Sequence, residues 1–389
     1  MKDFIFYVPT KILFGEQAKA FVEEVSPLGD HVLVVYGGGS IKKNGIYEEI
    51  VPALQEKGVE VVELAGVEPN PRLETVKKGV SLCRERGVDF ILAIGGGSSI
   101  DCAKLVAAAV PCEGDPWDIV TGKQAVREAL PLVTVLTLSA TGSEMDTSSV
   151  ISRDDSKEKL GWASDLVLPK VSLLNPAYTK TVNAWQTASG TADIMSHTME
   201  NYFTSYDDCY LQDSFAEGLL RTCLQYGPVA VKEPENLEAR QNLMWAGSWA
   251  INGLLDAGKH TAWSVHPMEH ELSAYFDITH GAGLAVLTPH WLTHVLNEKT
   301  EKKVARFARR VFDCREEDDR KAAEAGIAAL AQFFRELGLP KNLEELKIKE
   351  EALPEMAQQC IAHKGGPIPG FVDLTEEDVL EIYRAAYRV

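Results

Sequence analysis

Two apolar runs that are each followed by the same four residues constrain the fold most. "HVLVVY" (31–36) and "VDFILAI" (88–94) are continuous apolar runs, and each is followed by Gly-Gly-Gly-Ser. Such runs are typical of strands buried on both faces, as in a parallel sheet that helices cover. Similar apolar runs lie at 59–64, 130–138 and 170–175, and amphipathic helical segments separate the runs. The first part of the chain therefore predicts an α/β, Rossmann-like domain.

The pattern of the chain changes near residue 180. Beyond Val182 the apolar residues recur with helical spacing, and runs that resemble buried strands almost vanish. We predict an α/β dinucleotide-binding domain over 1–180 and an all-helical metal-binding and catalytic domain over 181–389. Two domains agree with the length of 389 residues, because single hydrophobic cores stop growing at roughly 250–300 residues.

Charge and cysteine content narrow the class of protein. The 57 acidic residues outnumber the 39 Lys and Arg residues, and the net charge of −18 disfavours nucleic acids and anionic membranes as partners. No apolar run reaches the roughly 18 residues that a membrane span needs. The seven cysteines form no Cys-x-x-Cys pair, which is typical of free thiols in a reducing compartment. We expect a cytoplasmic protein that acts on a small molecule.

The two Gly-Gly-Gly-Ser loops lie where a parallel sheet commonly binds nucleotides. Glycine has no Cβ, so its backbone N–H groups can approach phosphate oxygens, and a following helix adds its positive N-terminal end. One such loop alone is equally compatible with a tight turn, and neither loop matches Gly-x-Gly-x-x-Gly. Two of them after successive strands favour nucleotide binding.

The first loop also bears on the choice of cofactor. Proteins that hold an unphosphorylated adenosine ribose commonly offer a carboxylate near this strand end. Here the loop continues into Ser40, Lys42 and Lys43, with no carboxylate among them. A hydroxyl and two ammonium groups would attract a 2′-phosphate, so NADP(H) is favoured over NAD(H). The alternative is that both lysines are only solvated.

Histidines are concentrated in the second half of the chain. His266 and His270 are four residues apart, so they share one face of a helix, and His280 follows. Asp193 and His197 are also four apart on a predicted helix. Together these positions can supply three imidazoles and one carboxylate, which suits Zn²⁺ or Fe²⁺. The alternative for any single one is an ordinary helical residue.

Four longer motifs carry a family resemblance. They are "GGGSSIDCAK", "TLSATGSEM", "GTADIMSHTMENYF" and "HPMEHELSAYFDITHGAGLAVLTP". They resemble the iron-containing (group III) alcohol dehydrogenase family, and "YGGGSIKKNG" resembles its NADPH-dependent butanol dehydrogenase and aldehyde reductase branch. The resemblance spans essentially the whole chain. It implies an N-terminal Rossmann-like domain joined to an all-α metal-binding domain, which is the architecture of dehydroquinate synthase.

The resemblance assigns roles around the metal. It implies that His270 lies near the substrate without binding the metal, and we regard it as the candidate catalytic proton relay. The implied metal ligands are Asp193, His197, His266 and His280. The implied reaction is hydride transfer between NADP(H) and a small aldehyde or primary alcohol, with the carbonyl polarised by one divalent Fe²⁺ or Zn²⁺ ion.

The resemblance also assigns cofactor contacts along the first half of the chain. These are Gly38, Gly39 and Ser40 at the 2′-phosphate, Asn70 near the adenosine, Gly96, Gly97 and Ser98 at the pyrophosphate with Asp101 after them, Thr137, Leu138 and Thr147 along the cofactor, and Lys159 at the nicotinamide ribose. The chain departs from the family in "TLSATGSE" (137–144), where many members read "TTAGTGSE". It also carries Met268 and Glu269 in the third ligand region, where many members have a glycine after the His-Pro pair. Glu269 either tunes the pocket or faces solvent, and we favour solvent.

Other functions remain open from sequence alone. A metal-dependent lyase of the dehydroquinate synthase type would need a basic cluster in the helical domain, where we see only Lys259. An NAD-dependent polyol or glycerol dehydrogenase and a non-catalytic binder are further alternatives. The family resemblance also implies a homodimer formed through N-terminal strands, for which "DFIFYV" (3–8) is the expected edge strand.

Overall fold

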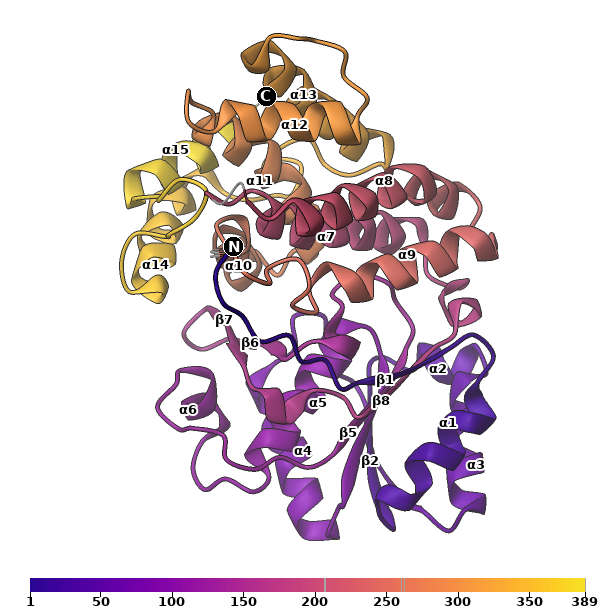
Figure 1. Ribbon diagram of the computed structural model, residues 1–389. Coiled ribbons are helices and arrows are strands. Elements are labelled where there is room, and N and C mark those ends of the chain that lie inside the picture. Colours follow the sequence, from indigo (N-terminus) through magenta and orange to yellow (C-terminus); the bar gives the residue numbers. More distant parts are fainter. Residues whose placement is uncertain (206–207, 260, 262, 389) are drawn as a thin grey trace. The chain divides into compact units, whose positions relative to one another are not determined.

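Two units can be distinguished in the computed structural model, which describes residues 1–205, 208–259, 261 and 263–388 (Figure 1). The α/β unit comprises Tyr7–Val182 and Glu235–Ser248. The helical unit comprises Met1–Phe6, Asn183–Pro234 and Trp249–Val389. The segment 235–248 therefore packs with the α/β unit, although it is helical and follows residue 180.

A six-stranded parallel sheet forms the centre of the α/β unit, so the predicted fold class is confirmed for this part. Each of the five apolar runs predicted as strands coincides with one strand of this sheet, although β4 extends one residue beyond its run. In spatial order the strands are β1 (Lys11–Phe14), β8 (Val171–Leu174), β5 (Leu132–Leu136), β4 (Phe90–Gly95), β2 (His31–Tyr36) and β3 (Glu60–Leu64).

Both faces of the sheet are buried, which explains the continuous apolar runs. Successive side chains of a strand point to opposite faces. Leu33 and Val35 pack into the core on the side of α4 (Leu73–Arg86) and α5 (Gly97–Ala109). Val32 and Val34 pack on the side of α1 (Ala18–Val25) and α3 (Ile46–Glu56). Figure 1 shows α1 and α3 on the other side of the sheet from α4 and α5.

The remaining elements of the α/β unit connect or extend these layers. They are α2 (Ser40–Lys43), α6 (Pro116–Val120), the antiparallel hairpin of β6 (Ser148–Arg153) and β7 (Glu158–Ala163), and most of α9 (Leu237–Ala250). Met244 of α9 is buried in the same core cluster as Leu33. The hairpin was not predicted, although "SSVISRDDSKEKLGWA" (148–163) carries a polar turn between two short runs.

The helical unit confirms the predicted change of pattern. Its helices are α7 (Ala184–Tyr202), α8 (Tyr210–Lys232), α10 (Val265–Phe276), α11 (His280–Val295), α12 (Glu301–Val311), α13 (Asp319–Glu336), α14 (Leu353–Lys364) and α15 (Glu376–Tyr387). Short 3-10 helices lie in the α/β unit at Ser26–Leu28, Ser143–Met145, Asp165–Val167 and Pro176–Thr179, and in the helical unit at Glu350–Ala352.

In the part of the chain that is described, no helix is long and apolar enough to cross a membrane. All seven cysteines are free thiols, as predicted.

The N-terminal segment differs from the prediction. Residues 3–8 were expected to form an edge strand, but they have no regular secondary structure, and Ile5 is 95% exposed. The edge strand is β1, which begins at Lys11 and pairs with β8. Pro9 separates the two segments and has no backbone N–H to donate to a ladder, so pairing begins only after it.

Candidate metal centre and nucleotide loops

Three helices of the helical unit bring the four predicted metal ligands together. Asp193 and His197 lie on α7, His266 on α10, and His280 is the first residue of α11. The Nε2 atoms of the three histidines lie 3.5 to 3.9 Å from Oδ1 of Asp193. The aspartate, His197 and His266 are buried, and His280 is partly exposed.

A glycine explains how α11 reaches α7. At Gly281 a Cβ would lie 2.0 Å from the backbone oxygen of Ser189, so any side chain would separate the two helices. Ser189 is one helical turn before Asp193, and the two residues therefore share a face of α7. Because Gly281 permits this close approach, the neighbouring His280 lies beside Asp193.

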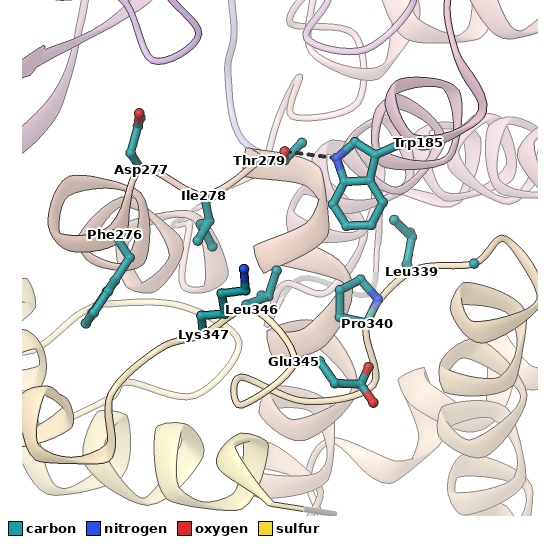
Figure 2. A pocket seen from close by; sticks show the side chains of 11 residues that line it. Trp185, Phe276, Asp277, Ile278, Thr279, Leu339, Pro340, Glu345, Leu346 and Lys347 are labelled. Atoms are coloured by element: carbon teal, nitrogen blue, oxygen red, sulfur yellow. Dashed lines mark hydrogen bonds between the residues drawn. The ribbon is translucent and has the colours of Figure 1, made fainter.

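The loop between α10 and α11 is also held in place (Figure 2). Asp277 ends α10 in the left-handed conformation, with φ of 49°. The indole nitrogen of Trp185, at the start of α7, donates to Oγ1 of Thr279 over 3.0 Å. A pocket of about 450 Å³ adjoins this loop, and none of the four predicted ligands lines it. The loop therefore fixes the position of His280 from the side of α7.

A carboxylate on α7 supports His266. Oε1 of Glu200 accepts hydrogen bonds from the backbone N–H groups of Val265 and His266, at 2.7 and 3.0 Å, and Oε2 accepts from the N–H of Ser264 at 2.8 Å. Nδ1 of His266 lies 3.1 Å from Oε1 of the same carboxylate. Because both oxygens of Glu200 accept from backbone N–H groups, Nδ1 is the donor in this contact, and Nε2 keeps its lone pair on the side of Asp193.

A second carboxylate, that of Glu269 on α10, supports His280, and its position differs from the expected one. Glu269 was expected to face solvent, but it is completely buried and its Oε2 accepts from Nδ1 of His280. Its Oε1 accepts from Oγ of Ser273. The residue is buried because its face of α10 meets α11, where Gly283 leaves room: a Cβ there would lie 2.8 Å from Cγ of Glu269.

The donor set fits a divalent transition metal. Three imidazole nitrogens lie 3.5 to 3.9 Å from one carboxylate oxygen, and such ligands suit Zn²⁺ or Fe²⁺. Asp193, His266 and His280 each place a ligand atom within 4.8 Å of the other two. Nε2 of His266 is buried without a hydrogen-bond partner among the described residues. Burial, and then the neighbouring His266 and His280, hold the pKa of His197 well below its ordinary value, so its ring is in the neutral, ligating form.

His270 lies beside this cluster on α10. Its ring centroid is 6.3 Å from that of His266 and 5.7 Å from that of His280. The side chain is half-buried, so it can reach both the cluster and water. The structure thus places the predicted proton relay next to the predicted ligands.

The second glycine loop joins β4 to α5 and is packed against the segment after β5. A Cβ on Gly96 would lie 3.1 Å from Cβ of Leu138, and one on Gly97 would lie 2.3 Å from Cγ2 of Thr141. The N–H of Thr137 donates to the oxygen of Gly95 over 3.0 Å. The predicted contacts at 96–98, 137 and 138 are therefore neighbours at the carboxyl ends of two adjacent strands, where α/β sheets bind ligands.

Asp101 connects this loop to the hairpin. Its Oδ1 accepts from Oγ of Ser143 at 2.6 Å, and its Oδ2 accepts from the N–H of Val150 at 2.9 Å. Burial raises the pKa of Asp101 to about 6. Both carboxylate oxygens are thus engaged with the segment that carries Thr147, while Lys159 lies buried on β7.

The first glycine loop is more open. Gly39 has φ of 89°, a Cβ on Gly38 or Gly39 would meet no atom within 4 Å, and α2 begins at Ser40. Asn70 lies buried with φ of 52° between β3 and α4, and the Arg72 guanidinium donates to its backbone oxygen.

The surroundings of Lys42 correct a premise of the cofactor prediction. A carboxylate does lie near this loop, because Nζ of Lys42 is 2.9 Å from Oε2 of Glu63. Although burial opposes it, hydrogen bonds from Tyr36, Tyr47 and Lys42 lower the pKa of Glu63 to about 2. Glu63 is on β3, and the sequence pattern did not show that β3 lies next to β2.

Comparisons with known proteins identify the family of the chain. Residues 9–176 match the model of the family "Iron-containing alcohol dehydrogenase", and 187–387 match "Fe-containing alcohol dehydrogenase family, C-terminal". The chain is 49% identical to NADH-dependent butanol dehydrogenase A of Clostridium acetobutylicum, with 100% of both chains covered. It is 40% identical to the NADPH-dependent aldehyde reductase YqhD of Escherichia coli, over 99% of this chain and 100% of that one.

A solved structure is similar over the whole chain. The crystal structure of NADH-dependent butanol dehydrogenase A from Thermotoga maritima matches with a TM-score of 0.96 and 38% identity, covering 100% of this chain and 99% of that one. The chain therefore belongs to the iron-containing alcohol dehydrogenase family. It is an oxidoreductase of alcohols and aldehydes, and its family implies a divalent metal and a nicotinamide cofactor.

Proposed function

We propose that the protein transfers a hydride between NADP(H) and a small aldehyde or primary alcohol such as butanal or butanol. The observation that carries this proposal is the convergence of three histidine Nε2 atoms within 3.5 to 3.9 Å of Oδ1 of Asp193. Asp193, His197, His266 and His280 would hold one Fe²⁺ or Zn²⁺ ion. The bound ion would supply Lewis acidity toward the carbonyl oxygen, and the nicotinamide would supply the hydride.

The side chains around the centre have separate tasks. Glu200 and Glu269 hold His266 and His280 with Nδ1 protonated, so that Nε2 of each faces Asp193. His270, which is half-buried beside both rings, would hold and pass the proton of the alcohol hydroxyl, because imidazole changes charge near neutral pH.

The preference for NADP(H) is the finer part of the proposal. Lys42 is engaged by Glu63, so Ser40 and Lys43 are the groups left to meet a 2′-phosphate. The open space at Gly38 and Gly39 would admit it. The relatives named above differ in this respect, since the clostridial enzyme is named for NADH and the E. coli enzyme for NADPH.

The lyase alternative is weakened by the helical unit. A lyase of this type needs a free basic cluster to hold its phosphorylated substrate. The helical unit does contain a basic cluster larger than Lys259 alone, because Lys303 and Arg306 belong to it. However, Lys259 lies 2.9 Å from Asp213, Lys303 contacts the same carboxylate, and Arg306 lies 2.7 Å from Glu217. These cations are already paired inside the protein, so they would not be free to hold a phosphate.

We also propose a cytoplasmic homodimer formed through the N-terminal segment. Ile5 and Tyr7 are 95% and 65% exposed, and β1 is the edge strand that follows them. Exposed apolar side chains and an open strand edge each favour pairing with another chain. The seven free thiols suit a reducing compartment.

The function is tested by initial rates of NADPH and NADH oxidation with butanal. The full chain is stripped with a chelator and reloaded with Fe²⁺ or Zn²⁺. We expect metal-dependent turnover, faster with NADPH, that is abolished in Asp193→Asn and retained in Asp155→Asn, an exposed carboxylate of the hairpin turn. Equal rates with NADH would contradict the cofactor preference. Absence of turnover with either metal would contradict the oxidoreductase centre and favour the lyase or the binder.

A further inference from the structure

The three ligand-bearing helices are linked by a repeated carboxylate–imidazole contact. In "HTME" (197–200) and "HPME" (266–269) a glutamate follows a predicted ligand by three residues. Glu200 contacts His266 on the next ligand helix, and Glu269 contacts His280 on the one after. α7 and α10 thus each supply both a ligand and the carboxylate that contacts the ligand on the next helix, and α11 supplies the last ligand.

From this pattern we infer that Glu269 is a positioning residue that determines how tightly the centre retains its divalent cation. The inference rests on the proposed metal centre. Oε2 of Glu269 accepts the Nδ1–H of His280, which fixes the tautomer and aims Nε2 at Oδ1 of Asp193, 3.7 Å away. It also raises the electron density on the ligating nitrogen.

The burial of Glu269 supports a dedicated role. A carboxylate without a partner is costly to remove from water, and this one is completely buried. Its two oxygens accept from His280 and Ser273, and the missing side chain of Gly283 provides its space. Three positions on two helices therefore accommodate one acidic group, and that group contacts a predicted ligand.

Another arrangement uses the same atoms. Glu269, His270 and His280 each place a possible ligand atom within 4.8 Å of the other two, so a second cation could in principle share His280. We favour the positioning role because Oε2 of Glu269 is already in hydrogen-bond contact with Nδ1 of His280. The number of metal ions per chain separates the two arrangements.

The same helix provides a matched control. Glu271 is also buried, and its Oε1 lies 2.7 Å from Nδ1 of His363 on α14. This is another glutamate–imidazole pair, two residues along α10, but His363 is not among the predicted ligands. Glu271→Gln therefore perturbs an equivalent buried pair away from the centre.

The experiment measures metal retention in the full chain. Wild type, Glu269→Gln, Glu269→Ala and Glu271→Gln are loaded with Zn²⁺, and the metal per chain and its rate of loss to excess chelator are measured. We expect Glu269→Ala to lose about 10- to 100-fold in affinity. Glu269→Gln should lose less, because its amide oxygen still accepts the Nδ1–H, and Glu271→Gln should match wild type. With Co²⁺ in place of Zn²⁺, the visible absorption spectrum should change only in the Glu269 variants.

Each contrary outcome has a different meaning. A wild type that binds no metal would contradict the proposed centre, and the role of Glu269 with it. One ion per chain with equal retention in all variants would leave the centre intact and overturn the role of Glu269. Two ions in wild type and one in Glu269→Ala would show a second cation site instead. If Glu269→Ala does not fold, as judged by circular dichroism, Glu269→Gln decides.

Discussion

The two Gly-Gly-Gly-Ser loops are identical in sequence, but the structure uses their glycines for different reasons. In the loop after β4, Cβ atoms on Gly96 and Gly97 would lie 3.1 and 2.3 Å from the nearest side-chain atoms. In the loop after β2, a Cβ on Gly38 or Gly39 would meet no atom within 4 Å, and Gly39 has φ of 89°. Gly96 and Gly97 of the second loop are therefore needed for space, whereas Gly39 of the first loop is needed for backbone conformation.

The carboxylates near the two loops have pKa values shifted in opposite directions. Glu63, beside the first loop, has a pKa lowered to about 2 by hydrogen bonds that outweigh its burial. Glu144 lies in the segment that follows the second loop's packing partners, and burial raises its pKa to about 7. Its Oε1 accepts from Oγ of Ser248 at 2.5 Å, and its Oε2 has no partner among the described residues. The surroundings of the first loop are polar, and those of the second are closed.

The largest effect is expected from titration of Glu144. Burial raises the pKa of Glu144 above its value in the unfolded chain, so protonation of this side chain adds to the free energy of unfolding. This stabilisation is fully present below about pH 4.5 and is lost as the pH rises through about 7. The difference from the ordinary pKa of 4.5 corresponds to roughly 3 kcal/mol. Urea unfolding of wild type and Glu144→Gln between pH 5 and 8 measures it: the advantage of wild type over the variant should shrink as the pH rises.

Glu63→Gln is the control for this titration. The carboxylate of Glu63 is ionised throughout pH 5 to 8, and its stabilising effect is lost only as the pH falls through about 2. This variant should therefore differ from wild type by an amount that is independent of pH in that range. The closed character of the second loop's surroundings would be contradicted if the Glu144→Gln difference were equally independent of pH.

The next largest effect is expected from Gly97→Ala. Its Cβ would lie 2.3 Å from Cγ2 and 2.5 Å from Oγ1 of Thr141, a short branched side chain that cannot swing away. Overpacking of this kind destabilises by roughly 2 kcal/mol, and the shifted loop should also bind NADPH more weakly. Urea unfolding and fluorescence titration with NADPH measure the two effects. Double replacement with Thr141→Ser, which removes Cγ2, should recover part of the loss; no loss in Gly97→Ala would show that the loop is not closely packed.

The smallest effects separate the two glycines of the first loop. Gly39→Ala forces a side chain into the left-handed region at φ of 89° and should destabilise by about 1 kcal/mol. Gly38→Ala meets no neighbouring atom and has no such φ, so it should change the free energy of unfolding by less than about 0.5 kcal/mol. Urea unfolding of both variants checks the difference. Equal losses in the two would contradict the conformational role of Gly39.

The sequence determined the features that depend on local pattern. Continuous apolar runs predicted the parallel strands because both faces of the sheet are buried. The spacing of four residues placed Asp193 with His197, and His266 with His270, on shared helix faces. The family motifs then identified the chemistry, and the comparisons confirm that family. The roles of the individual ligands and cofactor contacts stay predictions.

Only the tertiary structure decided which side chains meet across elements. No pattern in the sequence singled out Glu200, and Glu269 was expected to face solvent, yet each contacts a histidine on another helix. Lys42 looked free for a phosphate until β3 placed Glu63 beside it. Segment 235–248 has helical periodicity, yet it packs with the α/β unit. Periodicity tells which face of an element is buried, but not which neighbour covers it, because the neighbour is chosen by packing that involves distant parts of the chain.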